Sequence, residues 1–498
     1  MAITPYPHQL DAVNHLGHPD VPGRLIADDM GLGKTLEALL IDNELRSERH
    51  SPGGNNKLHP CYKKPTLIVA PKATHYDAWV PAIEKLFDWT LDGDDGILVE
   101  VVDPKNRAKL VERLKRQPLP AYVIVHYEAL RLIPELADVD WFHIICDEVH
   151  RVKNRKAQQT HYLKVLKTHY KTGLSGTPAD DKPQDIWSVL NWLYPKQFSS
   201  YWRFVNTYCA QETETIRGGR SFRKITGVNR DRIPELHRIW APWYIRRLKD
   251  DVLDSLPPKT YTEMYVDLLP AQRRAYEQMR KDMIAWIGEN QDQPLVATIA
   301  VAQLVRLQQF ALATVDIEQV YRSTRAFTGV PNERRLVSRV TLTDPSSKLD
   351  RLEEIIEGNP NEPLVVFTQS RSMVDLVVKR MHSGGISAVP YHGRISDGNR
   401  IEAVRSFQSG RAQVFAGTIA AGGEGITLHR ASNMVFLDRM WNPTKNRQAE
   451  DREHRIGQEQ PVQIIDIMAS NTVDRGRHQR ITDKWSELRW LLGDMTGA

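Results

Sequence analysis

The chain has 498 residues, of which 41% are hydrophobic and 26% are charged, and its net charge is +5. The length predicts two or three domains, and the composition is that of a soluble, mildly basic globular protein. No apolar run approaches the roughly 18 residues of a membrane span, and no secretory signal is visible at the N-terminus. Three scattered cysteines without a CxxC pair argue against a zinc or disulfide framework.

Short apolar runs alternate with amphipathic stretches in the first part of the chain. Residues 24–27 precede a glycine-containing loop, and residues 34–45 follow it with helical spacing. Further buried strands are predicted at 65–71, 96–103, 121–127 and 142–148. Continuous apolar runs of this kind belong to parallel sheets covered on both faces, which predicts βαβ units and an α/β class.

The middle of the chain, from about residue 184 to residue 345, has mostly helical patterns. The LPPKT stretch at 256–260 interrupts it and is a predicted hinge. After residue 347 the βαβ pattern returns, and strands are predicted at 363–369, 386–393, 412–418, 433–438 and 462–469. We therefore expect two α/β lobes and a helical middle.

Two stretches concentrate positive charge. Residues 216–230 carry five basic side chains and no acid, and residues 319–340 carry five arginines and one acid, Glu333. Either stretch alone is typical of a solvated loop. Together they suggest projections that contact phosphates.

Residues 27–35, ADDMGLGKT, indicate a phosphate-binding loop between a strand and a helix. Backbone N–H groups that converge at a helix N-terminus bind anions. Gly31 and Gly33 would let the backbone approach the phosphates closely. Lys34 would supply positive charge to the β and γ oxygens, and the Thr35 hydroxyl would bind Mg²⁺.

One residue of this stretch departs from the common phosphate-loop pattern. Asp28 stands six places before the lysine, where that pattern has glycine. The loop can curl without this glycine if Asp28 lies at the exit of the strand. A chance Gly-Lys-Thr turn is the alternative.

The second motif is DEVH, from Asp147 to His150. The preceding apolar strand would deliver two carboxylates to its C-terminal edge, where ligands bind in open α/β sheets. Asp147 would orient Mg²⁺, and Glu148 would accept a proton from the attacking water. A solvated acidic turn is the alternative. The phosphate-binding loop and the acid pair together indicate a nucleoside triphosphatase.

The third motif is QAEDREHRIGQ at 448–458. Arg452 and Arg455 lie three residues apart and would share one helix face, from which both would point at a γ-phosphate. A surface helix with salt bridges is the alternative. Because the pair belongs to the other lobe, we expect the second lobe to complete the site and hydrolysis to move the lobes.

The order of these motifs resembles that of the SWI/SNF-type ATPases of helicase superfamily 2. The resemblance runs from Gln9 to about Asp474, and its most specific parts are LSGTP at 174–178 and QAEDRxHRIGQ. It implies two RecA-like lobes with helical protrusions. The N-terminal lobe would span 1–255, with a protrusion at about 185–245. The C-terminal lobe would span 256–498, with a helical insertion at about 265–345 and a brace helix at about 477–493.

The resemblance also implies ATP and Mg²⁺ as cofactors, with Thr35 and Asp147 as metal ligands. Gln9 would contact the adenine edge. The implied nucleotide-binding set is Gln9, Asp29, Met30, Gly31, Leu32, Gly33, Lys34, Thr35, Gly425 and Gln448, and the implied catalytic set is Lys34, Asp147, Glu148, Arg452 and Arg455.

Three further residues, His150, Ser175 and Thr177, would couple the nucleotide site to a nucleic-acid groove; a structural role is the alternative for His150. The family tracks duplex DNA through its phosphates. The implied contacts are Lys72, Thr74, His126, Tyr127, Thr368, Arg394, Arg400, Thr418 and Trp441. The alternative is that these are ordinary polar residues at strand ends, and for Trp441 the alternative is packing in the core.

Two positions depart from the family pattern. Glu424 stands in GGEGITL where an apolar residue is usual, and HGRIS at 392–396 replaces the DGS form. The DDMGLGKT form is similar to the annealing-helicase and fork-remodelling branch, and the chain has no visible accessory segment. We expect a minimal bacterial or phage member in the cytoplasm, with a nuclear protein as the alternative.

The predicted function is therefore an ATP-dependent, monomeric motor that moves along double-stranded DNA, including forked or branched DNA, without separating strands. One alternative is a strand-separating or RNA-directed helicase of the same superfamily. Another is a DNA-binding scaffold with an inactive ATP site.

Overall fold

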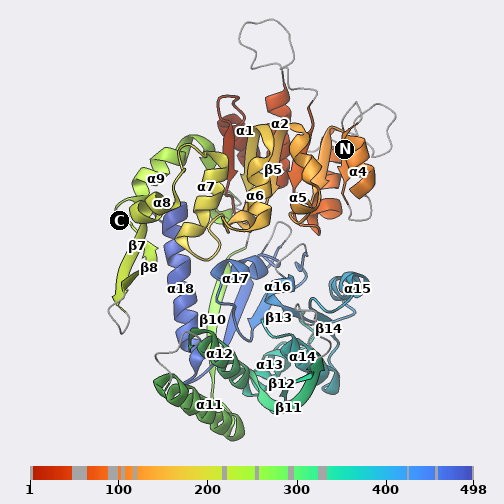
Figure 1. Cartoon of the computed structure of the whole chain (residues 1–498). Helices are drawn as coiled ribbons and strands as arrows, with labels where there is room; N and C mark the ends of the chain where they lie inside the picture. Colours follow the sequence, from red (N-terminus) through yellow and green to blue (C-terminus); the bar gives the residue numbers. More distant parts are fainter. Residues whose placement is uncertain are drawn as a thin grey trace, which may run out of the picture. The chain divides into compact units, whose positions relative to one another are not determined.

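The computed structural model describes residues 4–47, 64–87, 99–102, 107–115, 120–215, 221–252, 257–289, 296–323, 334–422, 426–454 and 458–495. The chain forms two compact units, one of Met1–Leu256 with Asp483–Ala498 and one of Pro257–Thr482. Each unit is built on a main parallel sheet with helices on its faces, as Figure 1 shows. The predicted α/β class with two parallel sheets is therefore confirmed.

The sheet of the first unit has the strand order β3-β4-β2-β5-β6-β1-β9, and all neighbouring pairs run parallel. The predicted strands are present. The sequence pattern misses β6, where polar residues alternate, and the two-residue β9. The bounds are β1 Gly23–Ile26, β2 Thr66–Val69, β3 Val99–Val101, β4 Tyr122–Val125, β5 Asp140–Asp147, β6 Lys167–Leu174 and β9 Tyr244–Ile245.

Helices cover both faces of this sheet because its side chains alternate between two hydrophobic cores. On β4, for example, Val123 belongs to one core and Ile124 to the other. On one face pack α1 Pro7–Leu16, α2 Lys34–Arg46 and α3 Val80–Phe87. On the other pack α4 Arg107–Leu114, α5 Ala129–Leu132, α6 Gln158–Val165 and α7 Trp187–Leu193.

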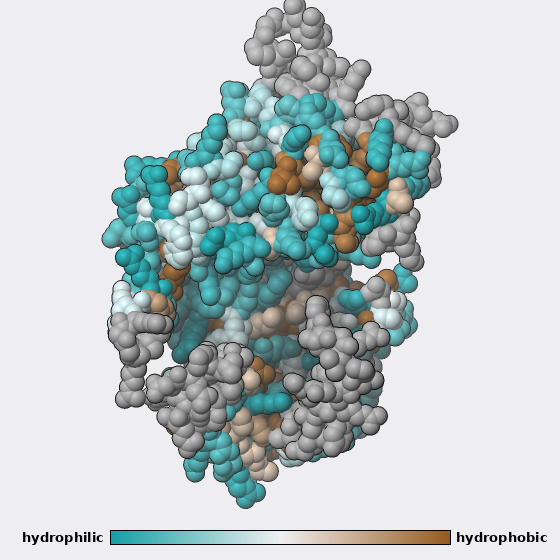
Figure 2. All heavy atoms as spheres, viewed as in Figure 1, coloured by the Kyte–Doolittle hydropathy of each residue, from teal (hydrophilic) through white to brown (hydrophobic). Residues whose placement is uncertain are grey.

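The region after β6 is less helical than the sequence pattern predicts. Besides α7 it contains α8 Tyr201–Tyr208, α9 Ile233–Trp240 and α10 Lys249–Val252. Between α8 and α9 lies an antiparallel hairpin of β7 Cys209–Thr215 and β8 Ser221–Val228. Within the basic stretch 216–230, residues 221–228 form β8 of this hairpin. Figure 2 shows that the face of the first unit seen there is mostly hydrophilic, with hydrophobic residues gathering near α5.

The sheet of the second unit has the strand order β10-β17-β16-β13-β15-β14, again all parallel. The pattern misses β10, whose alternating polar and apolar residues follow the predicted hinge. The bounds are β10 Lys259–Val266, β13 Leu364–Thr368, β14 Ala388–Tyr391, β15 Val414–Thr418, β16 Asn433–Phe436 and β17 Val462–Ala469.

The helices of the second unit are again divided between two cores. The core with α13 Ser347–Gly358 and α14 Arg371–Ser383 lies on one face, and that with α15 Asp397–Gln408, α16 Ile419–Gly422 and α17 Pro443–Glu450 on the other. The predicted helical insertion consists of α11 Pro270–Glu289, α12 Val296–Leu312 and a hairpin of β11 Thr314–Ser323 and β12 Arg334–Thr343. The predicted helical insertion at about 265–345 thus contains a strand hairpin besides its two helices.

The last helix, α18 Val473–Leu492, begins in the second unit, and its residues from Asp483 onward belong to the first. The sequence places the corresponding helix, at about 477–493, wholly in the C-terminal lobe. The difference arises because Leu488, Leu491 and Leu492 are buried in a core of the first unit. Within the described ranges, no helix has the length and apolar character that crossing a membrane requires.

Candidate nucleotide site

The loop between β1 and α2 has the curled backbone that phosphate binding requires. Gly31 and Gly33 have φ angles of 91° and 89°, in the left-handed region that glycine adopts at little cost. Lys34 begins α2, and its ammonium donates hydrogen bonds to the carbonyls of Asp28 (2.7 Å) and Asp29 (2.9 Å). This ammonium and the N-terminal turn of α2 together fit an anion.

Asp28, the departure from the common loop pattern, is fully buried at the exit of β1. Its carboxylate accepts from the backbone N–H of Arg247 (2.9 Å) and from Nε of the same residue (2.9 Å). The same guanidinium donates to Glu37 Oε1 at 2.7 Å. Burial and the charge of Asp28 raise the pKa of Glu37 to about 8. Asp28 thus forms a buried ion pair with Arg247 at the position where the common loop pattern has glycine.

Gln9 fastens α1 to the phosphate loop. Its Oε1 accepts from the Tyr6 N–H at 3.0 Å, and its Nε2 donates to the Leu32 carbonyl at 3.1 Å. His8 Nε2 lies 2.9 Å from the same carbonyl. A primary amide has a second donor and a second acceptor position, so Gln9 retains groups that a base edge would need. Met30, also in the implied nucleotide set, is half-buried in the loop.

The acid pair lies at the carboxyl end of β5. Burial and the charge of Glu148 raise the pKa of Asp147 to about 6. Asp147 accepts from Trp79 Nε1 at 3.1 Å through its carboxylate and from the Tyr127 hydroxyl at 2.6 Å through its carbonyl. Glu148 has a φ of 52°, a left-handed conformation uncommon outside glycine. Such strain is frequent at functional sites.

Glu148 is in contact with the residues that the sequence assigns to coupling. His150 Nδ1 lies 3.2 Å from Glu148 Oε2 and 3.1 Å from Ser175 Oγ. The Ser175 hydroxyl donates to Glu148 Oε2 at 3.4 Å and accepts from the Thr177 N–H at 3.2 Å. His150 Nδ1 therefore contacts one residue of the acid pair, Glu148, and one residue of the LSGTP turn, Ser175.

Three neighbouring strands bring these parts together. β5, β6 and β1 are adjacent in the sheet, and their carboxyl ends lead to Glu148, Ser175 and the phosphate loop. Because parallel strands present their carboxyl ends at one edge, these groups lie at the same place. Ser175 N–H also donates to the Ile26 carbonyl at 3.1 Å.

The implied cofactors fit the residues present. Thr35 follows Lys34 in the first turn of α2, and Asp147 ends β5, two strands away from β1. A hydroxyl and one carboxylate are protein ligands that Mg²⁺ takes when triphosphate oxygens complete its shell. The glycine-containing loop supplies the space for those oxygens.

The predicted nucleic-acid contacts in the first unit differ in their accessibility. Lys72 is exposed, and the half-buried Thr74 donates its hydroxyl to the Pro71 carbonyl at 2.9 Å. His126 is buried, with Nδ1 3.0 Å from Glu128 Oε2. Tyr127 is only 1% exposed. Its hydroxyl donates to the Asp147 carbonyl, and a contact between Tyr127 and a nucleic acid stays a prediction.

The predicted contacts in the second unit differ in the same way. Thr368 is 1% exposed and donates to Asp438 Oδ1 at 2.6 Å, so the fold buries it. Its register partner on β15, Thr418, is also buried. Arg394 is exposed, and Arg400 and Trp441 are half-buried.

The arginine motif is described only in part. Arg452 is buried, and its Nη1 donates to the Ile426 carbonyl at 3.3 Å. Gln448 is buried and accepts from Lys445 Nζ at 3.1 Å. Arg455, Gly425 and Glu424 lie outside the described residues. Contacts of Arg452, Arg455, Gly425 and Gln448 with a nucleotide stay predictions.

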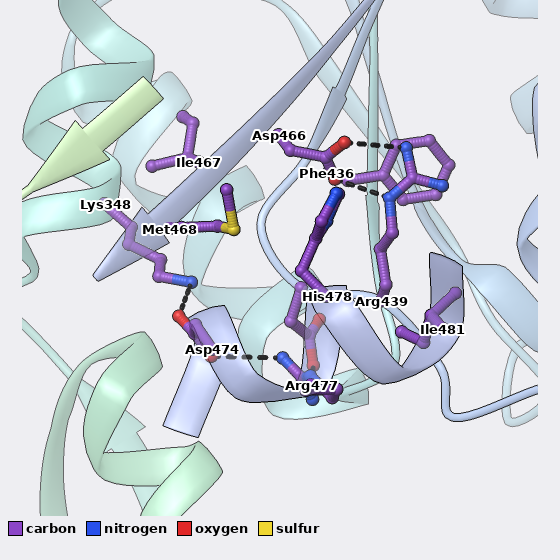
Figure 3. A pocket seen from close by; sticks show the side chains of 11 residues that line it. Lys348, Phe436, Arg439, Asp466, Ile467, Met468, Asp474, Arg477, His478 and Ile481 are labelled. Carbon is purple, nitrogen blue, oxygen red and sulfur yellow. Dashed lines mark hydrogen bonds and ion pairs between the residues drawn. The ribbon is translucent and has the colours of Figure 1, made fainter. Parts of the chain in front are cut away.

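A buried charge cluster supports this motif within the second unit. Arg439 binds both carboxylate oxygens of Asp466, at 2.5 and 2.8 Å, and donates to Glu450 Oε1 at 2.6 Å. Beside it, Lys348 and Arg477 bind Asp474 at 2.6 and 3.2 Å, as Figure 3 shows. Glu450 belongs to QAEDREHRIGQ, so these pairs fix the start of that stretch against β16 and β17.

Three residues next to the nucleotide site have no role in the sequence-based prediction. Trp79 contacts Asp147, Arg247 binds Asp28, and Arg246 Nη1 donates to the Ala27 carbonyl at 2.6 Å. Both arginines lie in the stretch WYIRRLKDDVLDSLPPK at 243–259, and its sequence does not show which groups their side chains contact.

Comparison with known proteins identifies the family. The SNF2-related domain model matches residues 8–311, and the Helicase conserved C-terminal domain model matches residues 347–457. The first match covers more than half of the chain, so the chain belongs to the SNF2-related family. The predicted membership of the SWI/SNF-type, helicase-like ATPases is confirmed.

Curated relatives are similar to the chain along most of its length. The ISWI chromatin-remodeling complex ATPase of Saccharomyces cerevisiae is 27% identical, over 96% of this chain and 40% of that protein. The human TATA-binding protein-associated factor 172 is 28% identical, over 90% of this chain and 26% of that protein. An uncharacterized ATP-dependent helicase of Mycoplasma pneumoniae is 27% identical, over 91% and 38%. The chain thus spans two fifths or less of the length of these relatives.

Among solved structures, the Sulfolobus solfataricus SWI2/SNF2 ATPase core in complex with dsDNA aligns with 22% identity and a TM-score of 0.41. The alignment covers 99% of this chain and 99% of that chain. This similarity is too low to transfer side-chain contacts.

Proposed function

We propose that the chain hydrolyses ATP and uses the hydrolysis to move along double-stranded DNA. The observation that carries the proposal is the meeting of three parts at one sheet edge. The phosphate loop follows β1, the acid pair ends β5, and Ser175 follows β6 between them. This arrangement serves phosphoryl transfer to water, because binding, activation and sensing groups converge.

Lys34 and Glu148 have the principal roles in this proposal. The Lys34 ammonium, which donates to two loop carbonyls, would turn to the β and γ oxygens of bound ATP. Mg²⁺, held by Thr35 and Asp147, would neutralise phosphate charge. Glu148 would take the proton of the attacking water, and its contacts with His150 and Ser175 would report the state of the γ-phosphate.

Arg452 and Arg455 would stabilise the charge that develops on the transferred phosphoryl group. Arginines in this role contribute on the order of 10³–10⁵ in rate. The Arg455→Ala variant should therefore bind both ATP and DNA but hydrolyse ATP slowly. Steady-state phosphate release measures this rate. Unchanged turnover in this variant would remove the arginine pair from the mechanism.

Duplex DNA is the substrate that the family and the charge distribution favour. One relative is named as the ATPase of a chromatin-remodeling complex, and the exposed residues of β8 include Arg223 and Lys224. We propose a monomeric motor on duplex DNA, including forked DNA, that does not separate strands.

The test is ATPase stimulation by duplex DNA, single-stranded DNA, forked DNA and RNA. We expect the greatest stimulation by duplex and forked DNA, with no single-stranded product from a forked substrate. Stimulation by RNA, or released single strands, would favour the helicase alternative. No phosphate release with any ligand would favour the DNA-binding scaffold.

A further inference from the structure

Arg246 joins the phosphate loop to the LSGTP turn. Its side chain is only 4% exposed. One terminal nitrogen, Nη1, donates to the Ala27 carbonyl at 2.6 Å and to the Gly176 carbonyl at 2.9 Å. Ala27 is the last residue before Asp28, and Gly176 follows Ser175. One guanidinium therefore fixes the separation of two turns that flank the proposed γ-phosphate position.

Asp494 holds the other side of this guanidinium. Arg246 Nη2 donates to Asp494 Oδ2 at 2.7 Å, and Nε donates to Asp494 Oδ1. The side chain of Asp494 is itself only 3% exposed. A two-point pair between guanidinium and carboxylate fixes orientation as well as charge. Asp494 thus determines where Nη1 of Arg246 points.

The end of α18 fixes Asp494 in place. Gly493 has a φ of 91°, and the N–H groups of Gly493 and Asp494 both donate to the Arg489 carbonyl, at 3.1 and 3.0 Å. This is a glycine-terminated helix end. The Tyr244 hydroxyl donates to the Leu492 carbonyl at 2.9 Å.

We propose that Asp494, acting through Arg246, is a positioning residue for the phosphate loop and the LSGTP turn. The inference rests on the proposed function, because it concerns how that site is held in shape. The end of α18 then belongs to the support of the nucleotide site, although it lies more than 450 residues after the loop in the sequence.

The consequence of losing Asp494 follows from what remains near Arg246. Asp29 of the phosphate loop lies 3.7 Å from Arg246 Nη2. A buried guanidinium without its first carboxylate would move toward Asp29. That movement would pull the loop away from its phosphate-binding shape.

The test compares nucleotide binding and turnover in the full chain with Asp494→Asn, Arg246→Lys and Tyr244→Phe. A fluorescent methylanthraniloyl ADP with Mg²⁺ gives Kd, ATP hydrolysis gives KM and kcat, and thermal unfolding gives Tm. We expect Asp494→Asn and Arg246→Lys to raise Kd and the KM for ATP by about tenfold, since each loses a charged hydrogen bond. Tyr244→Phe, which loosens the same helix end but keeps the ion pair, should lower Tm only.

A merely structural role would reduce the folded fraction, so kcat would fall while KM stayed constant. Unchanged Kd and KM in Arg246→Lys would overturn the inference even if Asp494→Asn failed to fold. If the unchanged chain neither binds nor hydrolyses nucleotide, the proposed function itself is wrong and the inference falls with it.

Discussion

At the residue scale, Gly33 holds a position that a larger residue can fill only by displacing a neighbour. Its φ of 89° is left-handed, and a Cβ added there would collide with Gln9 Nε2. Glycine is needed here for the contact between α1 and the loop, and also for the close approach of a phosphate.

Gly33→Ala should lower the affinity for Mg²⁺ with methylanthraniloyl ADP by about tenfold or more, because Gln9 must leave the loop. Fluorescence titration measures this affinity. Gly385→Ala is a matched control, since Gly385 has a φ of 76° and nothing within 4 Å of the added Cβ. The control should be strained but should bind nucleotide normally. Equal affinities in the two variants would refute the structural argument.

Glu148→Gln tests the general base. The amide keeps the size of the side chain and its contacts with His150 and Ser175 but cannot accept the proton. We expect normal ATP binding and a fall in kcat on the order of 10²–10⁴. Single-turnover phosphate release separates the two steps. Full turnover in this variant would show that another group activates the water.

At the element scale, two antiparallel hairpins replace part of the predicted helical middle. Residues 221–228 of one basic stretch form β8, and the described part of the other lies in β11 and β12. In β8 the residues from Ser221 to Lys224 are all exposed. Such a strand lacks the apolar alternation that marks a half-buried strand. Pairing with β7 therefore decides its structure, and the local sequence does not.

Arg223→Ala in this hairpin should weaken binding equally for all duplex sequences. Loss of one phosphate contact should reduce the slope of log K against log salt by about 0.9. Fluorescence anisotropy at several salt concentrations measures the slope. Lys167→Ala is a matched control, because Lys167 is exposed at the amino end of β6, away from the carboxyl edge. The same slope in both variants would mean that the hairpin does not contact DNA.

At the scale of the whole molecule, a buried polar network ties the first unit together. The fully buried Asp42 of α2 accepts from Thr66 of β2 and Tyr122 of β4, at 2.8 and 2.9 Å, and lies 2.9 Å from His143 of β5. His143 Nε2 lies 2.7 Å from the Thr172 hydroxyl of β6. One carboxylate thus joins a helix to the centre of the sheet.

This network makes stability depend on pH. Burial alone would raise the pKa of Asp42, but the charge of Arg46 and the hydrogen bond with His143 outweigh it, so the pKa lies well below its ordinary value. A carboxyl group with a lowered pKa stabilises the fold above the unfolded pKa of about 3.9, and this stabilisation is lost as the pH falls below it.

Asp42→Asn should destabilise the first unit by about 3 kcal/mol at pH 7. The difference in the free energy of unfolding between this variant and the unchanged chain should shrink as the pH falls below about 4. Urea unfolding of the full chain at several pH values measures both, with the two units treated as separate transitions. If the difference in the free energy of unfolding did not change with pH, Asp42 would not be charged in the folded protein.

The sequence locates much of the site because its chemistry depends on residues close together in the chain. ADDMGLGKT and DEVH each follow an apolar strand, so the loop and the acid pair can be placed from local pattern alone. Trp79, Arg246 and Asp494 cannot be found this way, because each reaches its partner across a long separation in sequence. The sequence pattern also does not show that Tyr127 and Thr368 are buried, because a polar side chain at the end of a strand can be either exposed or buried.

By itself, the sequence determined the α/β class, the two sheets, the phosphate loop and the family, because apolar periodicity and short motifs are local properties. Only the tertiary structure decided that the end of α18 packs in the first unit, that hairpins carry the basic stretches, and that Asp28 is a buried ion-pair partner. Those features arise from burial and charge pairing between distant segments, and burial is a property of the packed chain.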